Sequence, residues 1–303
     1  MYRRLVLTAL IAWTAIGAED LVTEVRAAIA KNDFALGEKL IQDFKTGRGT
    51  TPELILAVSW LGRGALAAKQ FDRADSYAVE ARKLALAQLT RRKLDAEAQL
   101  PLALGASIEV QAHVMDARGE RDQAVVFLRR ELAAYRNTSI RARIQKNIHL
   151  LSLEGKPAPA LDMNQWLGPK PVSLEQLKGR PVVLFFWAHW CSDCKRVGPD
   201  LAKLAAEFGF TVVGPTQRYG YVAGGVDSAP DVETKYIDTI RKEFYSSLSG
   251  MAVPVSEENF RNYGSSSSPT LVFIDRKGIV RLYRPGAMSY PDMVAAAKKI
   301  LAD

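Results

Sequence analysis

The residues best suited to chemistry are Cys191 and Cys194, the only two cysteines in a chain of 303 residues. They form a Cys-x-x-Cys pair that closely follows residues 181–187, an apolar run with the length of a strand buried on both faces. The pair also stands at the start of a predicted helix, residues 191–208, which ends before Gly209.

This placement favours thiol–disulfide exchange. The free N–H groups and partial positive charge of a helix N-terminus stabilise a thiolate at Cys191. Cys194 lies three residues later on the same helical face, close enough to close a disulfide and more buried. Cys191 is therefore expected to be the attacking thiol, and Cys194 the thiol that resolves the mixed disulfide.

The motifs around this pair resemble the thioredoxin superfamily. Residues 185–195, Phe-Phe-Trp-Ala-His-Trp-Cys-Ser-Asp-Cys-Lys, are similar to its active-site strand and helix start. Pro199 matches the proline that kinks its active-site helix, and Ser-Pro-Thr at 268–270 resembles its cis-proline loop. Residues 155–159 and 275–286 resemble the TlpA-like branch of exported thiol–disulfide oxidoreductases.

The resemblance implies roles for further residues. A cis Pro269 would lie against the disulfide, present the backbone of Ser268 to a substrate chain and keep metal from the dithiol. Trp190 would line the substrate surface, and Trp187 would pack beneath the site. The expected partners are protein substrates with thiols or disulfides and a membrane or periplasmic electron donor. No cofactor is expected.

Two positions depart from the family pattern. Thioredoxins carry a buried carboxylate six residues before the first cysteine, where this chain has Phe185. TlpA-like reductases often carry a glutamate three residues after the second cysteine, where this chain has Val197. His189 is the nearest titratable substitute and a possible acid–base group. Asp193 should oppose thiolate formation, whereas Lys195 should favour it.

Other uses of the cysteines are weighed against redox exchange. A structural zinc site would need a second cysteine pair, which the chain lacks. A copper chaperone would use Cys191, Cys194 and His189. An inert disulfide is disfavoured because this spacing closes a small, exposed loop, and peroxidase relatives usually carry a lone cysteine. A non-catalytic adaptor, in which the fold serves as a platform for partners, is a further alternative. No metal site is expected.

The N-terminus predicts export. Arg3 and Arg4 precede an almost entirely apolar or small stretch, residues 5–17, which acidic residues follow. This is the pattern of a secretory signal peptide, assigned to residues 1–18, and it predicts a periplasmic or otherwise extracytoplasmic location. No later apolar run reaches about 18 residues, so no spanning helix is expected.

Residues 19–154 are predicted to form an all-helical domain. They are rich in Ala, Leu, Arg and Gln with apolar residues at helical spacing. Residues 60–81 resemble a tetratricopeptide (TPR) hairpin, in which small residues let two antiparallel helices approach closely. Residues 32–37 and 118–124 are weaker echoes of the same pattern. Such a TPR-like domain either binds a partner in its groove or only packs on its neighbour.

Residues 155–303 are predicted to form an α/β thioredoxin fold after this helical domain. Glycine and prolines at 155–159 end the helical half. Strands are expected at 181–187, 211–213, 270–274 and 279–283, with helices at 191–208, at about 231–248 and from Ser289. The glycine- and tyrosine-containing segment 214–225 is either a solvated connection or a lid or rim over the site.

The net charge does not indicate nucleic-acid binding. Lys and Arg number 41 against 33 Asp and Glu, a formal net charge of +8. The excess is shared between the two halves, and its longest basic run is residues 91–93. A nucleic-acid-binding protein concentrates its basic residues on one face or arm.

Overall fold

The computed structural model describes residues 20–302. The predicted signal peptide, residues 1–18, lies outside the described residues. Within 20–302, no helix combines the length and the hydropathy that crossing a bilayer requires.

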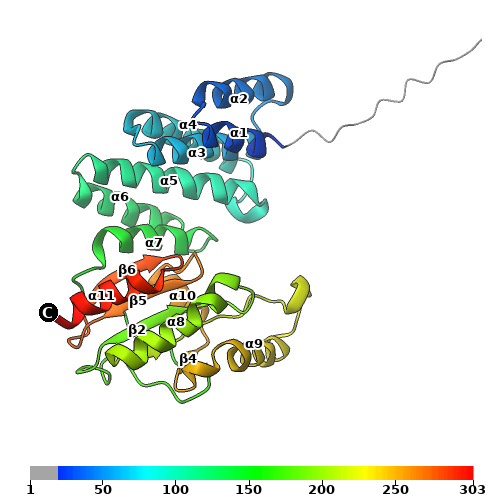
Figure 1. Cartoon of the computed structure of the whole chain (residues 1–303). Coiled ribbons are helices and arrows are strands. Elements are labelled where there is room, and N and C mark those ends of the chain that lie inside the picture. Colours follow the sequence, from blue (N-terminus) through cyan, green and yellow to red (C-terminus); the bar gives the residue numbers. More distant parts are fainter. Residues whose placement is uncertain (1–19, 303) are drawn as a thin grey trace, which may run out of the picture.

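The N-terminal part is a stack of helices (Figure 1). Its elements are α1 (Leu21–Ala30), α2 (Phe34–Arg48), α3 (Pro52–Ala67), α4 (Phe71–Leu89), the 3₁₀ turn η1 (Leu94–Ala96), α5 (Gln99–Ala117), α6 (Arg121–Ala134) and α7 (Arg141–Ser152). Short polar turns join α1 to α2, α3 to α4 and α5 to α6, and the helices of each pair pack on one another. The all-helical prediction for this region is confirmed.

Local sequence explains where these helices begin and how closely they approach. The side chains of Asp20, Asp33 and Thr51 accept backbone N–H groups at the starts of α1, α2 and α3. In α3, Gly62 faces α4, where an added Cβ would lie 3.5 Å from the backbone nitrogen of Ala78, an ordinary van der Waals contact. Ala74, Ala78 and Ala81 of α4 are buried in the same core.

The C-terminal part is a mixed α/β fold, as predicted. Its elements are β1 (Trp166–Leu167), β2 (Val182–Phe186), α8 (Ser192–Phe208), β3 (Thr211–Val213), η2 (Ala223–Gly225), α9 (Pro230–Phe244), η3 (Ser246–Leu248), β4 (Val253–Pro254), α10 (Glu257–Tyr263), β5 (Thr270–Ile274), β6 (Val280–Pro285) and α11 (Tyr290–Ala302). The main sheet has the order β3-β2-β5-β6, with β2 parallel to β3 and antiparallel to β5. A small second sheet pairs β1 with β4.

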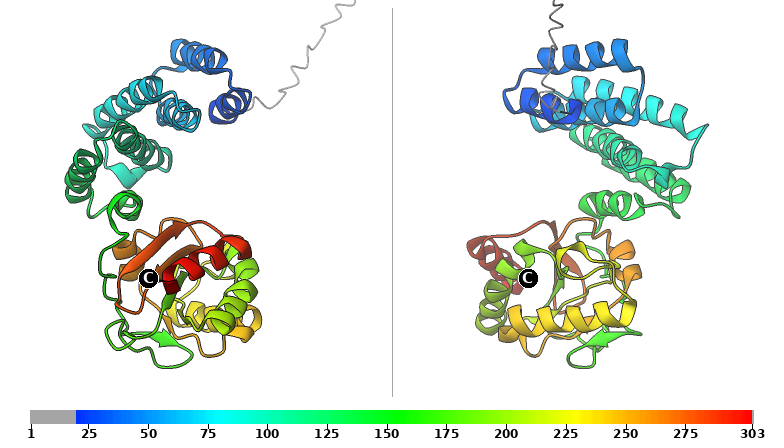
Figure 2. Two further views of the ribbon diagram at one scale, coloured as in Figure 1. Left: turned by 60° about the vertical axis from the view of Figure 1, so that its left-hand side comes forward. Right: turned by 90° about the vertical axis from the view of Figure 1, so that its right-hand side faces the viewer.

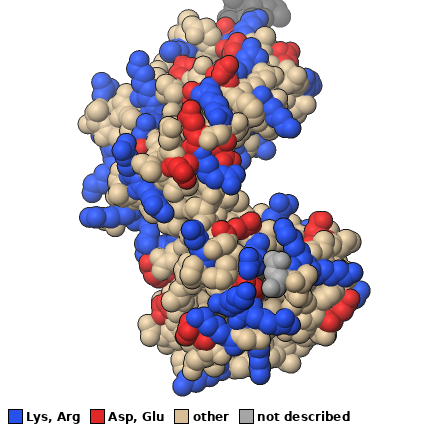
Figure 3. Space-filling model, turned by 90° about the vertical axis from the view of Figure 1, so that its left-hand side faces the viewer, with Lys and Arg blue, Asp and Glu red and all other residues tan. Residues whose placement is uncertain are grey.

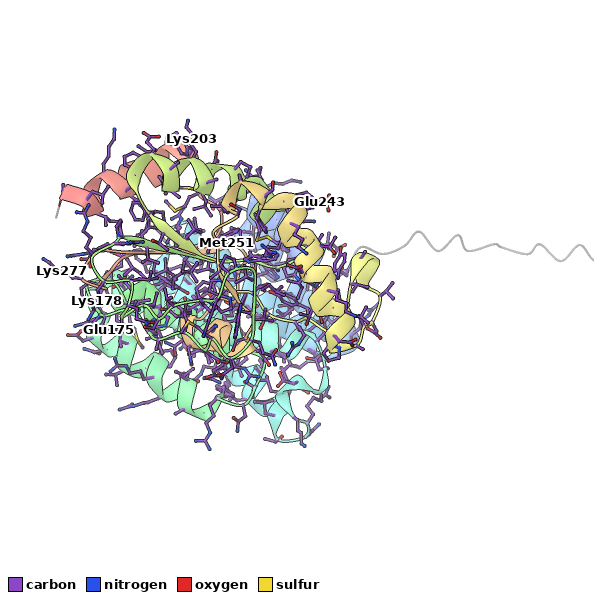
Figure 4. All side chains as sticks on the ribbon, turned by 90° about the horizontal axis from the view of Figure 1, so that it is seen from below. Glu175, Lys178, Lys203, Glu243, Met251 and Lys277 are labelled. Carbon is purple, nitrogen blue, oxygen red and sulfur yellow. A yellow bond between two sulfur atoms is a disulfide. The ribbon has the colours of Figure 1, made fainter. Side chains whose placement is uncertain are left out.

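Alternate side chains of β2 and β5 enter two cores on opposite faces of this sheet. Val183 and Phe185 pack with α8, α9 and α11, whereas Leu184 and Phe186 pack toward α10. Figure 2 shows α8 and α11 together on one face. Figure 4 shows Met251 in the interior, with the labelled charged residues nearer the periphery.

One predicted helix is shorter than expected. The stretch predicted as one helix over about 231–248 ends at Phe244, and a separate turn, η3, follows. Tyr245 leaves the helix and packs its ring edge against Phe185 and Trp187. Burying this aromatic ring under the sheet outweighs continuing the helix over residues 245–248. Strands β1 and β4 and helix α10 were not predicted, because each is too short to show a period.

Helix α7 joins the two parts through polar contacts. Arg141 pairs with Glu258 of α10 at 3.0 Å, and His149 Nε2 donates to the carbonyl of Asn262 at 2.8 Å. Gly264, at φ +61°, lies so close to α7 that an added Cβ would be 2.2 Å from the backbone nitrogen of Lys146. The helical domain thus rests on the thioredoxin fold with backbone against backbone (Figure 1).

Basic side chains are distributed over both domains on the face shown in Figure 3, with acidic side chains among them. The same view shows a notch between the two domains.

Candidate active site

Cys191 and Cys194 form a disulfide at the N-terminus of α8, with their Cα atoms 5.2 Å apart. Cys191 is the N-cap residue, and its Sγ accepts the backbone N–H of Cys194 at 3.0 Å. Cys191 is 4% exposed and Cys194 is fully buried. An incoming sulfur therefore meets Cys191 first, and a thiolate there would face the positive end of the helix.

Trp190, Ser268 and Pro269 lie on the same side of the fold as the disulfide. The Ser268–Pro269 peptide bond is cis, as the resemblance implies. Trp190 is 50% exposed, and it lines one cleft together with Ser268. By contrast, Trp187 is fully buried, and its Nε1 donates to the carbonyl of Gly214 at 2.9 Å.

Apolar, buried side chains occupy the two positions at which the family carries a carboxylate. Phe185 and Val197 are both buried in the core that contains the cysteines. Tyr245 packs against Phe185, and its buried hydroxyl has no hydrogen-bond partner in the described part of the chain. Burial raises the pKa of the Tyr245 hydroxyl. No acidic side chain takes over either position in the described structure.

His189 lies in a buried cage beside the disulfide helix. It and Glu233 of α9 are each 1% exposed, and His189 Nε2 lies 3.3 Å from Glu233 Oε1. The two groups are not aligned for a hydrogen bond, so His189 Nε2 has no such partner among the described residues. Burial lowers the pKa of His189, and the negative charge of Glu233 partly offsets this. The imidazole is therefore neutral near pH 7.

Three tyrosines complete this cage. The rings of Tyr219, Tyr221 and Tyr236 each meet the His189 ring edge-on, at centroid distances of 5.3–5.5 Å. Tyr219 also meets the ring of Trp190 edge-on at 5.5 Å. An aromatic chain thus runs from the buried His189 to the exposed Trp190.

Glu233 fastens the 214–225 segment to this cage. Its carboxylate accepts the backbone N–H of Tyr219 at 2.5 Å and that of Gly220 at 2.9 Å. Thr216 anchors the start of the segment by donating its hydroxyl to the carbonyl of Trp187 at 2.9 Å. Gln217 and Tyr219 line the cleft that also contains Trp190. Residues 214–220 of the segment therefore form a held rim of this cleft, whereas residues 223–225 are exposed.

Glu233 is the residue of this site that the sequence analysis missed. It stands in the first turn of α9, where an acidic side chain is usually explained by the helix dipole. The available signal was its spacing: Glu233, Ile237 and Ile240 share one face of α9, and all three are buried. An acidic residue on an apolar helix face needs a buried partner.

The two charged residues next to the cysteines face outward. Asp193 pairs with Arg196 at 2.5 Å, and both side chains are more than half exposed. Lys195 Nζ lies 4.4 Å from the ring centroid of Phe244. Solvent and these partners weaken the opposing effects predicted for Asp193 and Lys195 on the thiolate.

No group of three or more His, Cys, Asp or Glu residues is arranged to hold a metal ion within residues 20–302. The copper alternative would need His189 beside the two sulfurs, and its Nε2 lies against Glu233 instead.

The fold and the paired cysteines define a thioredoxin-like protein, and comparisons with known proteins agree. Residues 155–215 match the AhpC/TSA family. The thioredoxin-like protein YneN of Bacillus subtilis is 28% identical over 46% of this chain and 76% of its own length. The thiol:disulfide interchange protein DsbE of Pseudomonas fluorescens biotype C is 29% identical over 49% of this chain and 78% of its own.

Among solved structures, a thiol:disulfide interchange protein of the thioredoxin family from Chlorobium tepidum is 26% identical. It covers 49% of this chain and 97% of that protein, with a TM-score of 0.35. Through its C-terminal half, the chain is similar to thioredoxin-like proteins, among them thiol:disulfide interchange proteins named DsbE.

Proposed function

We propose that this protein is an exported thiol–disulfide oxidoreductase that reduces disulfides in protein substrates. The observation that carries the proposal is the Cys191–Cys194 disulfide, which caps α8 beside the exposed Trp190 and the cis Pro269. The interchange proteins among its relatives support this chemistry.

The reaction starts from the reduced dithiol. The Cys191 thiolate attacks one sulfur of the client disulfide; a Cys191–client S–S bond forms, the client S–S bond breaks, and the first client sulfur leaves as a thiolate that takes up a proton. The Cys194 thiolate then attacks Cys191 Sγ and releases the second client thiol. Two electrons and two protons pass to the client. A membrane or periplasmic dithiol donor restores the Cys191 and Cys194 thiols.

The neighbouring residues position the client and move protons. Trp190 supplies an exposed aromatic surface, and Ser268 before the cis Pro269 offers backbone to an extended client strand. We propose His189, two residues before Cys191 in the chain, as the acid–base group of the site, with its Nε2 directed at Glu233 rather than at the sulfurs. Its neutral imidazole can take up a proton, and the carboxylate of Glu233 stabilises the resulting charge.

Location and domain roles follow from the sequence pattern. Residues 1–18 direct export, residues 19–154 form a TPR-like helical domain that can bind a partner, and residues 155–303 carry the exchange chemistry. The stacked helix pairs support a TPR-like description.

The first test is a redox titration of the chain without residues 1–18. Fluorescence from Trp187 and Trp190 is followed in thiol–disulfide buffers. A reversible midpoint at about −250 mV or below is expected for a reductase, whereas about −120 to −180 mV would mark an oxidant or isomerase.

The second test compares two neighbouring substitutions. Cys191→Ser should abolish reduction of a disulfide-containing protein, whereas Ser192→Ala, an exposed change in the same turn, should leave turnover intact. Hydrogen peroxide serves as an alternative oxidant, and preferred turnover with peroxide would contradict the proposal. If Cys191→Ser keeps partners and no turnover exists in the native chain, the adaptor alternative replaces the enzyme.

A further inference from the structure

A cleft between the two domains begins at the redox site. It has a volume of about 660 Å³, within the usual range of about 300–1,000 Å³ for ligand sites. One wall comes from the thioredoxin fold and includes Trp190, Tyr219 and Ser268. The other wall comes from the helical domain, through residues 136–142 and Asp95. A client held at Trp190 and Ser268 would therefore also meet the helical domain.

A second hollow adjoins the cleft. That hollow, of about 730 Å³, shares Asp95, Asn137 and Thr138 with the first and extends to Arg92 and Lys93 beside η1. We name the joined hollows the interdomain groove. It leads from the disulfide helix to the η1 turn of the helical domain.

The helical-domain side of the interdomain groove has an excess of positive charge. Arg92, Lys93 and Arg136 are exposed, and none forms an ion pair with another residue in the part of the chain that the structure describes. The one acidic side chain there, Asp95, accepts the backbone N–H of Ser139 at 3.2 Å and also its hydroxyl. Three unpaired cations beside one carboxylate therefore leave a local excess of positive charge exposed to solvent.

The charges nearer the redox site cancel. Arg141 pairs with Glu258 at 3.0 Å, and Arg261 pairs with Glu257 at 2.5 Å. The rest of that wall includes Ser265, Ser266 and Ser268, whose hydroxyls and backbone suit hydrogen bonds to a peptide. The interdomain groove thus offers neutral, polar recognition beside the cysteines and cationic recognition further away.

The interdomain groove is preformed. The Arg141–Glu258 pair, the His149–Asn262 hydrogen bond and the close backbone approach at Gly264 hold its two walls together. Because the groove is already formed, binding a client does not require the conformational entropy loss of ordering its two walls.

We propose that the interdomain groove binds an extended, acidic segment of the client polypeptide next to its disulfide, so that the helical domain selects the clients. This inference rests on the proposed redox function. The cystine would lie at Trp190 and Ser268, and Asp or Glu residues a few positions along the client would meet Arg136, Lys93 and Arg92.

The test uses two synthetic peptides with the same intramolecular disulfide, one flanked by Asp and Glu and the other by Lys and Arg. The reduced chain without residues 1–18 is mixed with each peptide, and second-order rate constants are measured. Each is divided by the rate with hydroxyethyl disulfide, a small neutral disulfide. The acidic peptide should react at least about tenfold faster at low salt, and 0.5 M salt should remove most of the difference.

One charge-reversal variant and one neutral variant locate the effect. Lys93→Glu combined with Arg136→Glu should invert the preference, and the neutral pair Lys93→Gln with Arg136→Gln should abolish it. The matched control, Lys31→Glu with Lys39→Glu, changes two exposed residues, one in the turn after α1 and one on α2, at the far end of the helical domain (Figure 1), and should keep the preference.

The outcomes separate this inference from the redox function. Equal rates for the two peptides, with hydroxyethyl disulfide reduced, overturn the inference and leave the redox function standing. The inference is also overturned if the control variant with Lys31→Glu and Lys39→Glu loses the preference for the acidic peptide as strongly as the groove variant. The net charge of the protein would then explain the preference. If even hydroxyethyl disulfide is not reduced, the redox function fails and this inference fails with it.

Discussion

Two buried glutamates, one in each domain, have opposite surroundings. Glu109 of α5 accepts from Arg143 at 3.1 Å, Lys146 at 3.0 Å and Asn147 at 3.1 Å, all on α7. Glu233 instead accepts two backbone N–H groups and faces the neutral His189. The first carboxylate holds two helices together through charge, and the second holds a loop at the redox site through hydrogen bonds.

The pKa values reflect this difference. Burial tends to raise the pKa of Glu109, but the charges of Arg143 and Lys146 and the hydrogen bonds outweigh it and hold the pKa well below its usual range. The ion pairs of Glu109 stabilise the packing of α5 on α7. The hydrogen bonds of Glu233 stabilise the fold and also fix the rim of the cleft that we propose binds the client.

The largest expected effect is that of Glu109→Ala. It leaves Arg143 and Lys146 without a counter-charge, and breaking a buried ion pair costs about 3–5 kcal/mol. Urea unfolding should show this loss, while the reduction rate of hydroxyethyl disulfide per folded molecule stays unchanged. Glu80→Ala, an exposed change on α4, is the control. A loss below about 1 kcal/mol would show that the cluster is hydrated and the contrast with Glu233 is wrong.

Glu233→Gln should cost about 1.5–3 kcal/mol, the range for hydrogen bonds to a charged group. It should also speed the hydrogen exchange of the Tyr219 and Gly220 amides and slow reduction of peptide disulfides, because the rim loses its anchor. Glu243→Gln, at an exposed position of the same helix, should change neither quantity. Unaltered amide exchange in Glu233→Gln would mean that the rim is held by other contacts.

Acidification should weaken the two regions in sequence. Burial lowers the pKa of both His189 and His149, so below about pH 6.5 the unfolded chain binds protons that the folded chain does not. Stability therefore falls by up to about 1.4 kcal/mol per pH unit for each histidine until its folded-state pKa is reached. Glu109 contributes stability that is full above about pH 4.3 and is lost only as the pH falls further toward its lowered pKa.

Hydrogen exchange measured between pH 7 and 3.5 checks this order. Amides near His189 should lose protection first, and those of α5 around Glu109 last; α7 carries both His149 and the partners of Glu109, so it responds to both titrations. His189→Gln should remove the early loss at the redox site only. Simultaneous loss near His189 and in α5 would contradict the assignment.

The smallest effect concerns a buried hydroxyl with no partner. Tyr245→Phe removes the unpaired hydroxyl and should raise stability by up to about 1 kcal/mol. The matched change Tyr283→Phe removes a hydroxyl that donates to the carbonyl of Tyr263 at 2.8 Å and should lower stability by about 1 kcal/mol. Thermal unfolding of both variants gives the comparison. A loss of stability in Tyr245→Phe would show that the hydroxyl has a partner, such as a buried water.

The sequence predicts the local parts of this site well and the distant parts poorly. The strand before Cys191 is a short apolar run and the helix after it is amphipathic. Such local patterns are enough to predict the fold class and most element positions. Glu233 and Tyr245 belong to the site through contacts with His189, Phe185 and Trp187, which lie 44 to 60 residues away in the sequence and which periodicity does not encode. The wall that α7 and residues 136–142 provide depends on how two domains dock, and no motif records that docking.

One hydrogen atom sets the distance between the domains. Gly264 meets the backbone of Lys146 and Gln145 where any larger residue would place a methyl group inside the space of main-chain atoms. Main chain does not yield as a flexible side chain does, so a substitution there requires the backbone of α7 or of the turn at Gly264 to move. Gly264 therefore keeps the two domains at their closest spacing. A larger residue there would change the width of the interdomain groove without replacing any residue that lines it.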